Sequence, residues 1–134
     1  MPLHLDIVTP QSPVFSEAVD AVTLPTARGE VGLLPGHAAL VSALGSGVLS
    51  YTRGADTQRL VISGGFVEVN NDRVSVLAEI AEKASDIDAD KVRAELQAAN
   101  SELAALTGGD TDAFDAAQAK IERAQARLQL AAGK

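Results

Sequence analysis

Apolar and polar residues alternate in several short runs within the first 78 residues. The ranges 3–7 and 19–24 alternate with period two, as expected of strands that bury one face. Further runs of this kind cover 48–52, 59–63, 66–70 and 73–77. Turn-forming residues at 54–56 and 70–72 predict tight connections between neighbouring strands. The pattern as a whole predicts a β-sandwich or a β-barrel.

Beyond residue 78 the apolar spacing changes to that of helices. Two helical stripes are predicted, at Val92, Leu96, Ala99, Leu103 and Leu106 and at Phe114, Ala117, Ile121, Ala124 and Leu128. Asp86 and Asp88 are candidate N-caps of the first helix, and the glycine-containing loop 107–110 ends it. So short a loop predicts an antiparallel hairpin. Because its facing stripes are narrow and rich in alanine, we expect the hairpin to need a surface on which to dock.

The range 31–51 contains no Asp, Glu, Lys or Arg. A stretch of that length is a candidate membrane span, since about 20 apolar residues cross a bilayer as a helix. Here Pro35 and four glycines interrupt it, which predicts turns between short strands. We therefore expect the stretch to be buried in the fold or pressed against a partner, without entering the membrane.

Composition narrows the classes of function. Apolar residues make up 46% of the chain, enough for a core, and the net charge of −7 disfavours a nucleic-acid binder. With no cysteine and two histidines, neither disulfides nor a transition-metal site is expected. The N-terminus has no basic region before an apolar run, so no secretory signal is predicted.

Several short motifs each allow two interpretations. Gly45-x-Gly47 starts a phosphate-loop pattern, but strand-like residues follow it, which favours a plain turn. Ser63, followed by two glycines, could be a hydrolase nucleophile served by His37, although a hairpin or bulge is the better interpretation. Arg123 and Arg127 share one helix face with Lys120, either as solvated charges, which we favour, or as an anion clamp.

Longer motifs carry a resemblance to a known family. They are the runs 29–40 (GEVGLLPGHAAL), 63–69 (SGGFVEV), 5–10 (LDIVTP) and 73–79 (RVSVLAE). Together these resemble the epsilon subunit of the F-type rotary ATP synthase. The resemblance implies a two-domain α+β fold. A flattened antiparallel β-sandwich over residues 1–85 would be followed by an antiparallel two-helix hairpin over 86–134.

The resemblance also implies a function without catalytic residues. The sandwich would couple the gamma subunit to the ring of c subunits, and the extended hairpin would reach the alpha/beta head and restrain ATP hydrolysis. Glu30 would face the c ring. His37 and Val41 would face gamma, with Pro35 and Gly36 in the same interface. The expected location is peripheral, on the cytoplasmic face of a bacterial plasma membrane or the stromal side of a thylakoid.

Some members of the family bind regulatory ATP, the only cofactor that the resemblance implies. Their motif is Ile/Leu-Asp-x-x-Arg-Ala, with two later arginines. Lys91 and Val92 stand here at the arginine and alanine positions, and lysine lacks the planar fork of arginine, so we expect weakened binding. The candidate contacts are Glu82, Ile87, Asp88, Lys91, Arg123 and Arg127. A free-standing adaptor and a small hydrolase are the alternatives to a rotor subunit.

Overall fold

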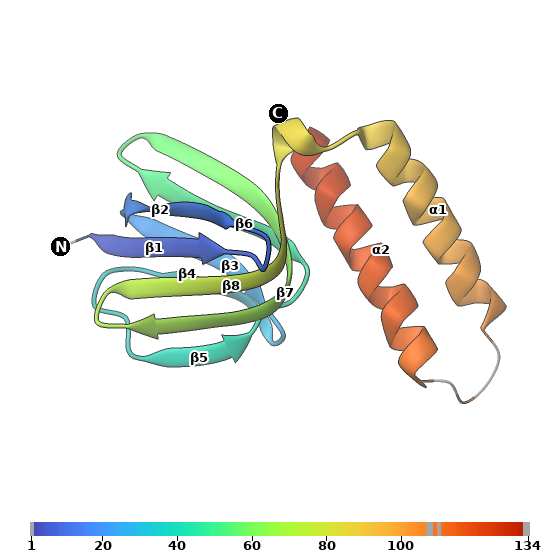
Figure 1. Cartoon of the computed structure of the whole chain (residues 1–134), viewed down its shortest axis with the longest axis horizontal. Helices are drawn as coiled ribbons and strands as arrows, with labels where there is room; N and C mark the ends of the chain where they lie inside the picture. The colour runs from blue at the N-terminus through green and yellow to red at the C-terminus, as the bar shows by residue number, and fades with distance from the viewer. Residues whose placement is uncertain (1, 107–108, 110, 133–134) are drawn as a thin grey trace.

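The computed structural model describes residues 2–106, 109 and 111–132, and consists of a β-sandwich with a helical hairpin beside it (Figure 1). The strands are β1 (Leu3–Val8), β2 (Pro13–Val19), β3 (Ala21–Thr26), β4 (Gly29–Leu33), β5 (Leu40–Ala43), β6 (Gly47–Arg53), β7 (Asp56–Asn70) and β8 (Arg73–Lys83). A short 3-10 helix, η1 (Ala84–Asp86), leads to helices α1 (Ala89–Ala105) and α2 (Thr111–Ala132).

The strands follow the order β2-β1-β8-β7-β6-β3-β4, and β5 pairs with β7 beside this path. All neighbouring strands are antiparallel except β1 and β8, which run parallel. The predicted α+β fold, with an N-terminal sandwich and a C-terminal two-helix hairpin, is confirmed. The boundary between residues 85 and 86 stays a prediction, and it falls inside η1.

The ranges 59–63 and 66–70 belong to one strand, β7, so the predicted hairpin or bulge at Gly64 and Gly65 is wrong. β7 keeps one register with β8 throughout, but its other partner is β6 up to Ile62 and β5 from Phe66 onward. Both glycines between these segments have positive φ, of 72° and 95°. They let the strand pass from one partner to the other.

The sandwich core is built from aliphatic side chains on the inner faces of its strands. The uncharged range 31–51 contributes Leu33, Leu44 and Leu49 to this core, all almost fully buried. Its other apolar residues include Val41, with 73% of its surface exposed, and Leu34, with 62%. The stretch is therefore partly core and partly exposed surface, and its packing against a partner stays a prediction.

Helix α2 lies between α1 and the sandwich, and contacts β6 and β7 (Figure 1). This arrangement explains an error in the predicted second stripe, because α2 buries residues on two sides. Ala126 and Leu130 are buried although neither belongs to that stripe, whereas Phe114 is 49% exposed. Of the two candidate N-caps, Asp88 accepts a hydrogen bond from the backbone N of Lys91 at 3.3 Å. Asp86 instead ends η1, and most of the predicted loop 107–110 lies outside the described residues.

Substitution of Gly65 by alanine should strongly destabilise the sandwich. A Cβ on Gly65 would lie 1.8 Å from the backbone O of Leu77, and its φ of 95° disfavours any side chain. We expect the free energy of unfolding in urea to fall by about 3 kcal/mol or more. Gly32→Ala in β4 is the matched control, since a Cβ there meets nothing within 4 Å. Equal stability of the two variants would contradict the account.

Candidate functional site

The hairpin contacts the sandwich through a small apolar cluster. Its buried members are Val61, Ile87, Val92, Ala124, Ala126 and Leu130. Val61 supplies the β7 side chain, while Ala126 and Leu130 come from the C-terminal half of α2. Two of the six buried members are alanines, which bury little apolar area each. The hairpin is thus docked on the sandwich, as its narrow stripes predicted.

Arg127 of α2 joins three elements at this contact. Its Nε lies 2.9 Å from an oxygen of Glu82 at the end of β8, and its Nη1 donates to Glu95 of α1 at 2.9 Å. The Nε–H does not point at the Glu82 carboxylate, so that pair is a charge contact without an aligned hydrogen bond. The Arg127 side chain is only 16% exposed. Its interpretation as a solvated charge is therefore wrong.

A cleft of roughly 330 Å³ opens between α1 and α2 near Arg127. Arg123 and Lys120 also line it, and Lys120 forms an ion pair with Glu102 across the two helices at 3.4 Å. The cleft is therefore lined by side chains of both signs.

The six candidate nucleotide contacts do not form one set. Arg123 lines the cleft with Arg127, and Arg127 reaches Glu82, so these three lie together. Ile87 is buried in the apolar cluster, and the Asp88 carboxylate caps α1. The Lys91 side chain is exposed. ATP binding stays a prediction.

A second feature is an apolar row across the outer face of four strands. It consists of Val8, Leu77, Phe66 and Ala43, each directly opposite the next on β1, β8, β7 and β5. Phe66 is 60% exposed and Leu77 is 55% exposed, and Val41 stands on the same face of β5. Side chains of this size exposed side by side indicate a surface that binds a partner.

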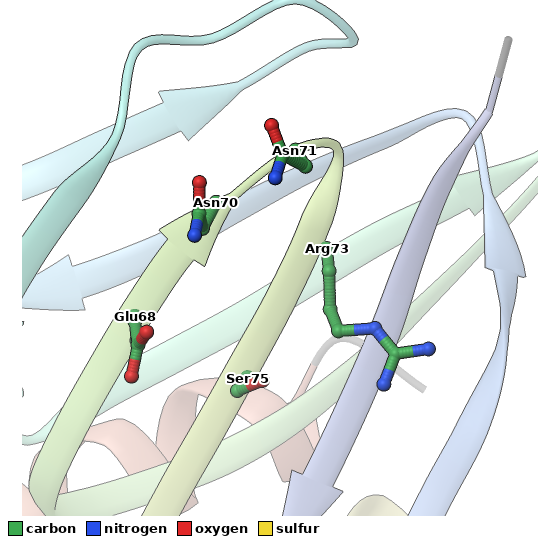
Figure 2. A pocket seen from close by; sticks show the side chains of 5 residues that line it. All are labelled: Glu68, Asn70, Asn71, Arg73 and Ser75. Carbon is green, nitrogen blue, oxygen red and sulfur yellow. The ribbon is translucent and has the colours of Figure 1, made fainter.

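Polar side chains occupy the same sheet face toward the β7–β8 turn. Glu68, Asn70, Asn71, Arg73 and Ser75 line a shallow hollow of roughly 300 Å³ there (Figure 2). Arg73 extends toward β1, where its guanidinium lies 3.8 Å from the Asp6 carboxylate (Figure 2). The face is therefore divided into an apolar part and a charged, polar part.

Asp6 is held ionised by its neighbours on this face. The Ser16 hydroxyl donates to the Asp6 carboxylate at 2.5 Å, and His4 Nε2 lies 3.2 Å from the same oxygen. The Ser16 hydrogen bond lowers the pKa of Asp6 from its ordinary value of 3.8, and His4 and Arg73 add to this effect. Burial of the carboxylate opposes the shift without reversing it.

The predicted interface residues lie in and near one turn. Pro35, Gly36 and His37 connect β4 to β5, and the backbone N of Gly36 donates to the Asp72 carboxylate at 2.7 Å. This bond fixes the turn against the tip of the β7–β8 hairpin. Glu30 is separate, in strand β4, where it pairs with Pro25.

The hydrolase and phosphate-loop interpretations find no support. Ser63 Oγ is hydrogen-bonded to Ser46 Oγ at 2.7 Å, whereas His37 Nδ1 lies 2.7 Å from the carbonyl of Ala38. A serine and a histidine acting together would need to bond each other. Gly47 begins strand β6, so no helix N-terminus follows it to bind phosphate.

Comparison with known proteins gives a consistent result. Residues 2–84 match the family model described as ATP synthase, Delta/Epsilon chain, beta-sandwich domain. The ATP synthase epsilon chain of Geobacter sp. (strain M21) is 43% identical over 96% of this chain and 93% of its own length. That of Nitratidesulfovibrio vulgaris (strain DP4) is 44% identical over 96% and 94%, respectively.

Two solved structures share the fold. A chain in the Euglena gracilis mitochondrial ATP synthase, OSCP/F1/c-ring in rotational state 1, superposes with a TM-score of 0.82 at 27% identity. The match covers 98% of this chain and 81% of that one. A chain of the Tetrahymena thermophila mitochondrial ATP synthase central stalk/c-ring gives 0.60 at 16% identity, covering 99% and 96%.

The sandwich is thus of the delta/epsilon class found in ATP synthases. The chain belongs to the family of epsilon subunits of F-type ATP synthase. Among the residues that the structure describes, neither helix is long and apolar enough to cross a membrane.

Stability at acid pH should depend on Asp6. A carboxylate whose pKa is lower in the folded state adds stability that is full above its unfolded pKa, about 3.9, and is lost as pH falls through the folded pKa. Urea unfolding from neutral pH down to acid pH should show this loss in the wild type and a smaller one in Asp6→Asn. Ser16→Ala, which removes the main hydrogen bond, should also reduce it. Identical acid dependence in all three proteins would contradict this assignment.

Proposed function

We propose that the chain is a non-catalytic subunit of the ATP synthase rotor that links gamma to the c ring. Its hairpin regulates ATP hydrolysis. The observation that carries the proposal is the exposed apolar row on a sandwich of the epsilon family. A chain of similar fold occurs in the Euglena gracilis mitochondrial ATP synthase, in the OSCP/F1/c-ring structure. We place the protein peripherally at the cytoplasmic face of a bacterial plasma membrane, because the relatives named above are bacterial.

The apolar row is the proposed contact with gamma. Phe66 and Leu77 form its centre, and Val41 extends it toward the turn that contains Pro35, Gly36 and His37. The polar hollow beside the row supplies a charged rim, an arrangement common in protein interfaces. Glu30 lies outside the row on β4, and we assign it to the c-ring contact.

Regulation would follow from the docking of the hairpin. In the folded arrangement α2 buries Ala126 and Leu130 against the sandwich and α1. A hairpin that extends toward the alpha/beta head gives up this contact, so the two arrangements compete. Since the contact is made by a few aliphatic side chains, modest binding energy elsewhere can shift the population. Regulatory ATP stays a prediction that this mechanism does not require.

Substitution of Phe66 by glutamate should weaken binding to gamma. A charge at the centre of the apolar row would have to be desolvated in the interface, so we expect the dissociation constant to rise by about tenfold or more. Calorimetric titration of purified gamma with the whole chain measures it. Thr57→Glu, at an exposed position of the same strand, is the matched control and should bind like the wild type. No binding of gamma by the wild type would favour a free-standing adaptor.

Removal of residues 86–134 should release ATP hydrolysis while leaving assembly intact. The deletion keeps the apolar row and all eight strands, but removes the segment proposed to restrain the catalytic head. Hydrolysis by the reconstituted complex should therefore rise, and ATP-driven proton pumping should persist. Equal hydrolysis with and without the hairpin, at equal subunit content, would show that this tail has no inhibitory role.

A further inference from the structure

We propose that Arg127, Glu82 and Glu95 form an ionic latch that holds the hairpin on the sandwich without a bound nucleotide. The three residues come from α2, the end of β8 and α1. The latch concerns how the folded hairpin is held, and its regulatory meaning rests on the function proposed above.

The geometry makes the latch specific to the folded arrangement. Arg127 lies 2.9 Å from each of the two carboxylates, using Nε for Glu82 and Nη1 for Glu95. Glu82 is directly opposite Val61, the β7 residue in the apolar cluster, so the ion pair borders the docking contact. Any movement of α2 away from the sandwich separates Arg127 from Glu82 before the hairpin itself must open.

Arg127 and Glu82 are partly sheltered from water, and this strengthens the attraction between them. The Arg127 side chain is 16% exposed and that of Glu82 is 21% exposed, whereas Glu95 is 47% exposed. Charge pairs that are partly withdrawn from solvent are screened less by salt than surface pairs. Loss of Glu82 would leave the sheltered Arg127 with only the more exposed Glu95 as counter-charge, which is costly.

The carboxylates of Glu82 and Glu95 already pair with the Arg127 guanidinium, which an anionic ligand in the cleft would need to bind. Arg127 is engaged by Glu82 and Glu95, and Lys120 is engaged by Glu102. A phosphate entering the cleft would have to displace these pairs. Glu82 and Glu95 therefore supply the negative charge beside Arg127 that a bound nucleotide would otherwise supply.

The latch is testable in the isolated whole chain by measuring the distance between sandwich and hairpin. The sequence contains no cysteine, so spin labels can be placed at Thr57→Cys in β7 and Gln125→Cys in α2, both exposed. Pulsed electron paramagnetic resonance measures the distribution of distances between the two labels, and this distribution gives the ratio of undocked to docked molecules. Far-ultraviolet circular dichroism confirms that each variant retains its helices and strands.

We expect Glu82→Gln to raise that ratio roughly tenfold, the effect of losing one partly buried ion pair. Glu95→Gln should raise it less, because Glu95 lies on α1 and acts on the sandwich contact only through Arg127. Lys120→Gln is the matched control, since its ion pair with Glu102 joins the two helices without touching the sandwich, and should leave the ratio unchanged. Molar salt should raise the ratio in the wild type more than in Glu82→Gln.

Millimolar ATP should leave the wild-type ratio unchanged. A ratio that is insensitive to Glu82→Gln would overturn the latch, and an ATP-induced fall in the wild-type ratio would overturn its independence from nucleotide. The measurement contains no other subunit, so its outcome is separate from the test of hydrolysis in the assembled complex. If Glu82→Gln raises the ratio but deletion of residues 86–134 leaves ATP hydrolysis unchanged, the latch stands and only the proposed regulatory function is contradicted.

Discussion

The arrangement of the whole molecule depends on α2 being packed on two sides. This helix contacts α1 on one side and β6 and β7 on the other, and its buried residues are Ala117, Ile121, Ala124, Ala126 and Leu130. Small side chains allow close approach on both sides, but each contact then buries little area. The helical hairpin is thus held on the sandwich through one face of α2. The charge contact of Arg127 with Glu82 adds an electrostatic component to the contact with the sandwich.

The sandwich has two outer regions that differ in whether the hairpin covers them. Because β7 changes partner at Gly64 and Gly65, the same long strand takes part in both. Near Val61 its outer surface is covered by the hairpin, whereas near Phe66 it stays exposed. A partner bound to the apolar row therefore leaves the hairpin contact accessible. This separation is what a subunit needs if it is to remain attached while its tail moves.

The fold was largely predictable from sequence, and the contact geometry was not. Period-two runs and the two helical stripes identified most elements, although β2 and the division of 31–51 into strands lacked a clear alternation. The resemblance directed attention to Glu82 and Arg127, which do meet, but spacing along one helix could not show that Arg127 would be buried. Likewise Phe66 and Leu77 look like core residues in isolation. Only the strand register shows that they point outward with Val8.

The central claim is that the hairpin must leave the sandwich in order to restrain ATP hydrolysis. Cysteines introduced at Glu82 and Arg127, whose side chains meet in the folded arrangement, can be joined by a short bismaleimide in a chain that has no other cysteine. Hydrolysis by the reconstituted complex is then compared for the linked and unlinked forms of this one variant. The account predicts that linked complexes hydrolyse ATP as fast as complexes without the hairpin, while unlinked complexes remain inhibited. Equal inhibition of linked and unlinked complexes would contradict it.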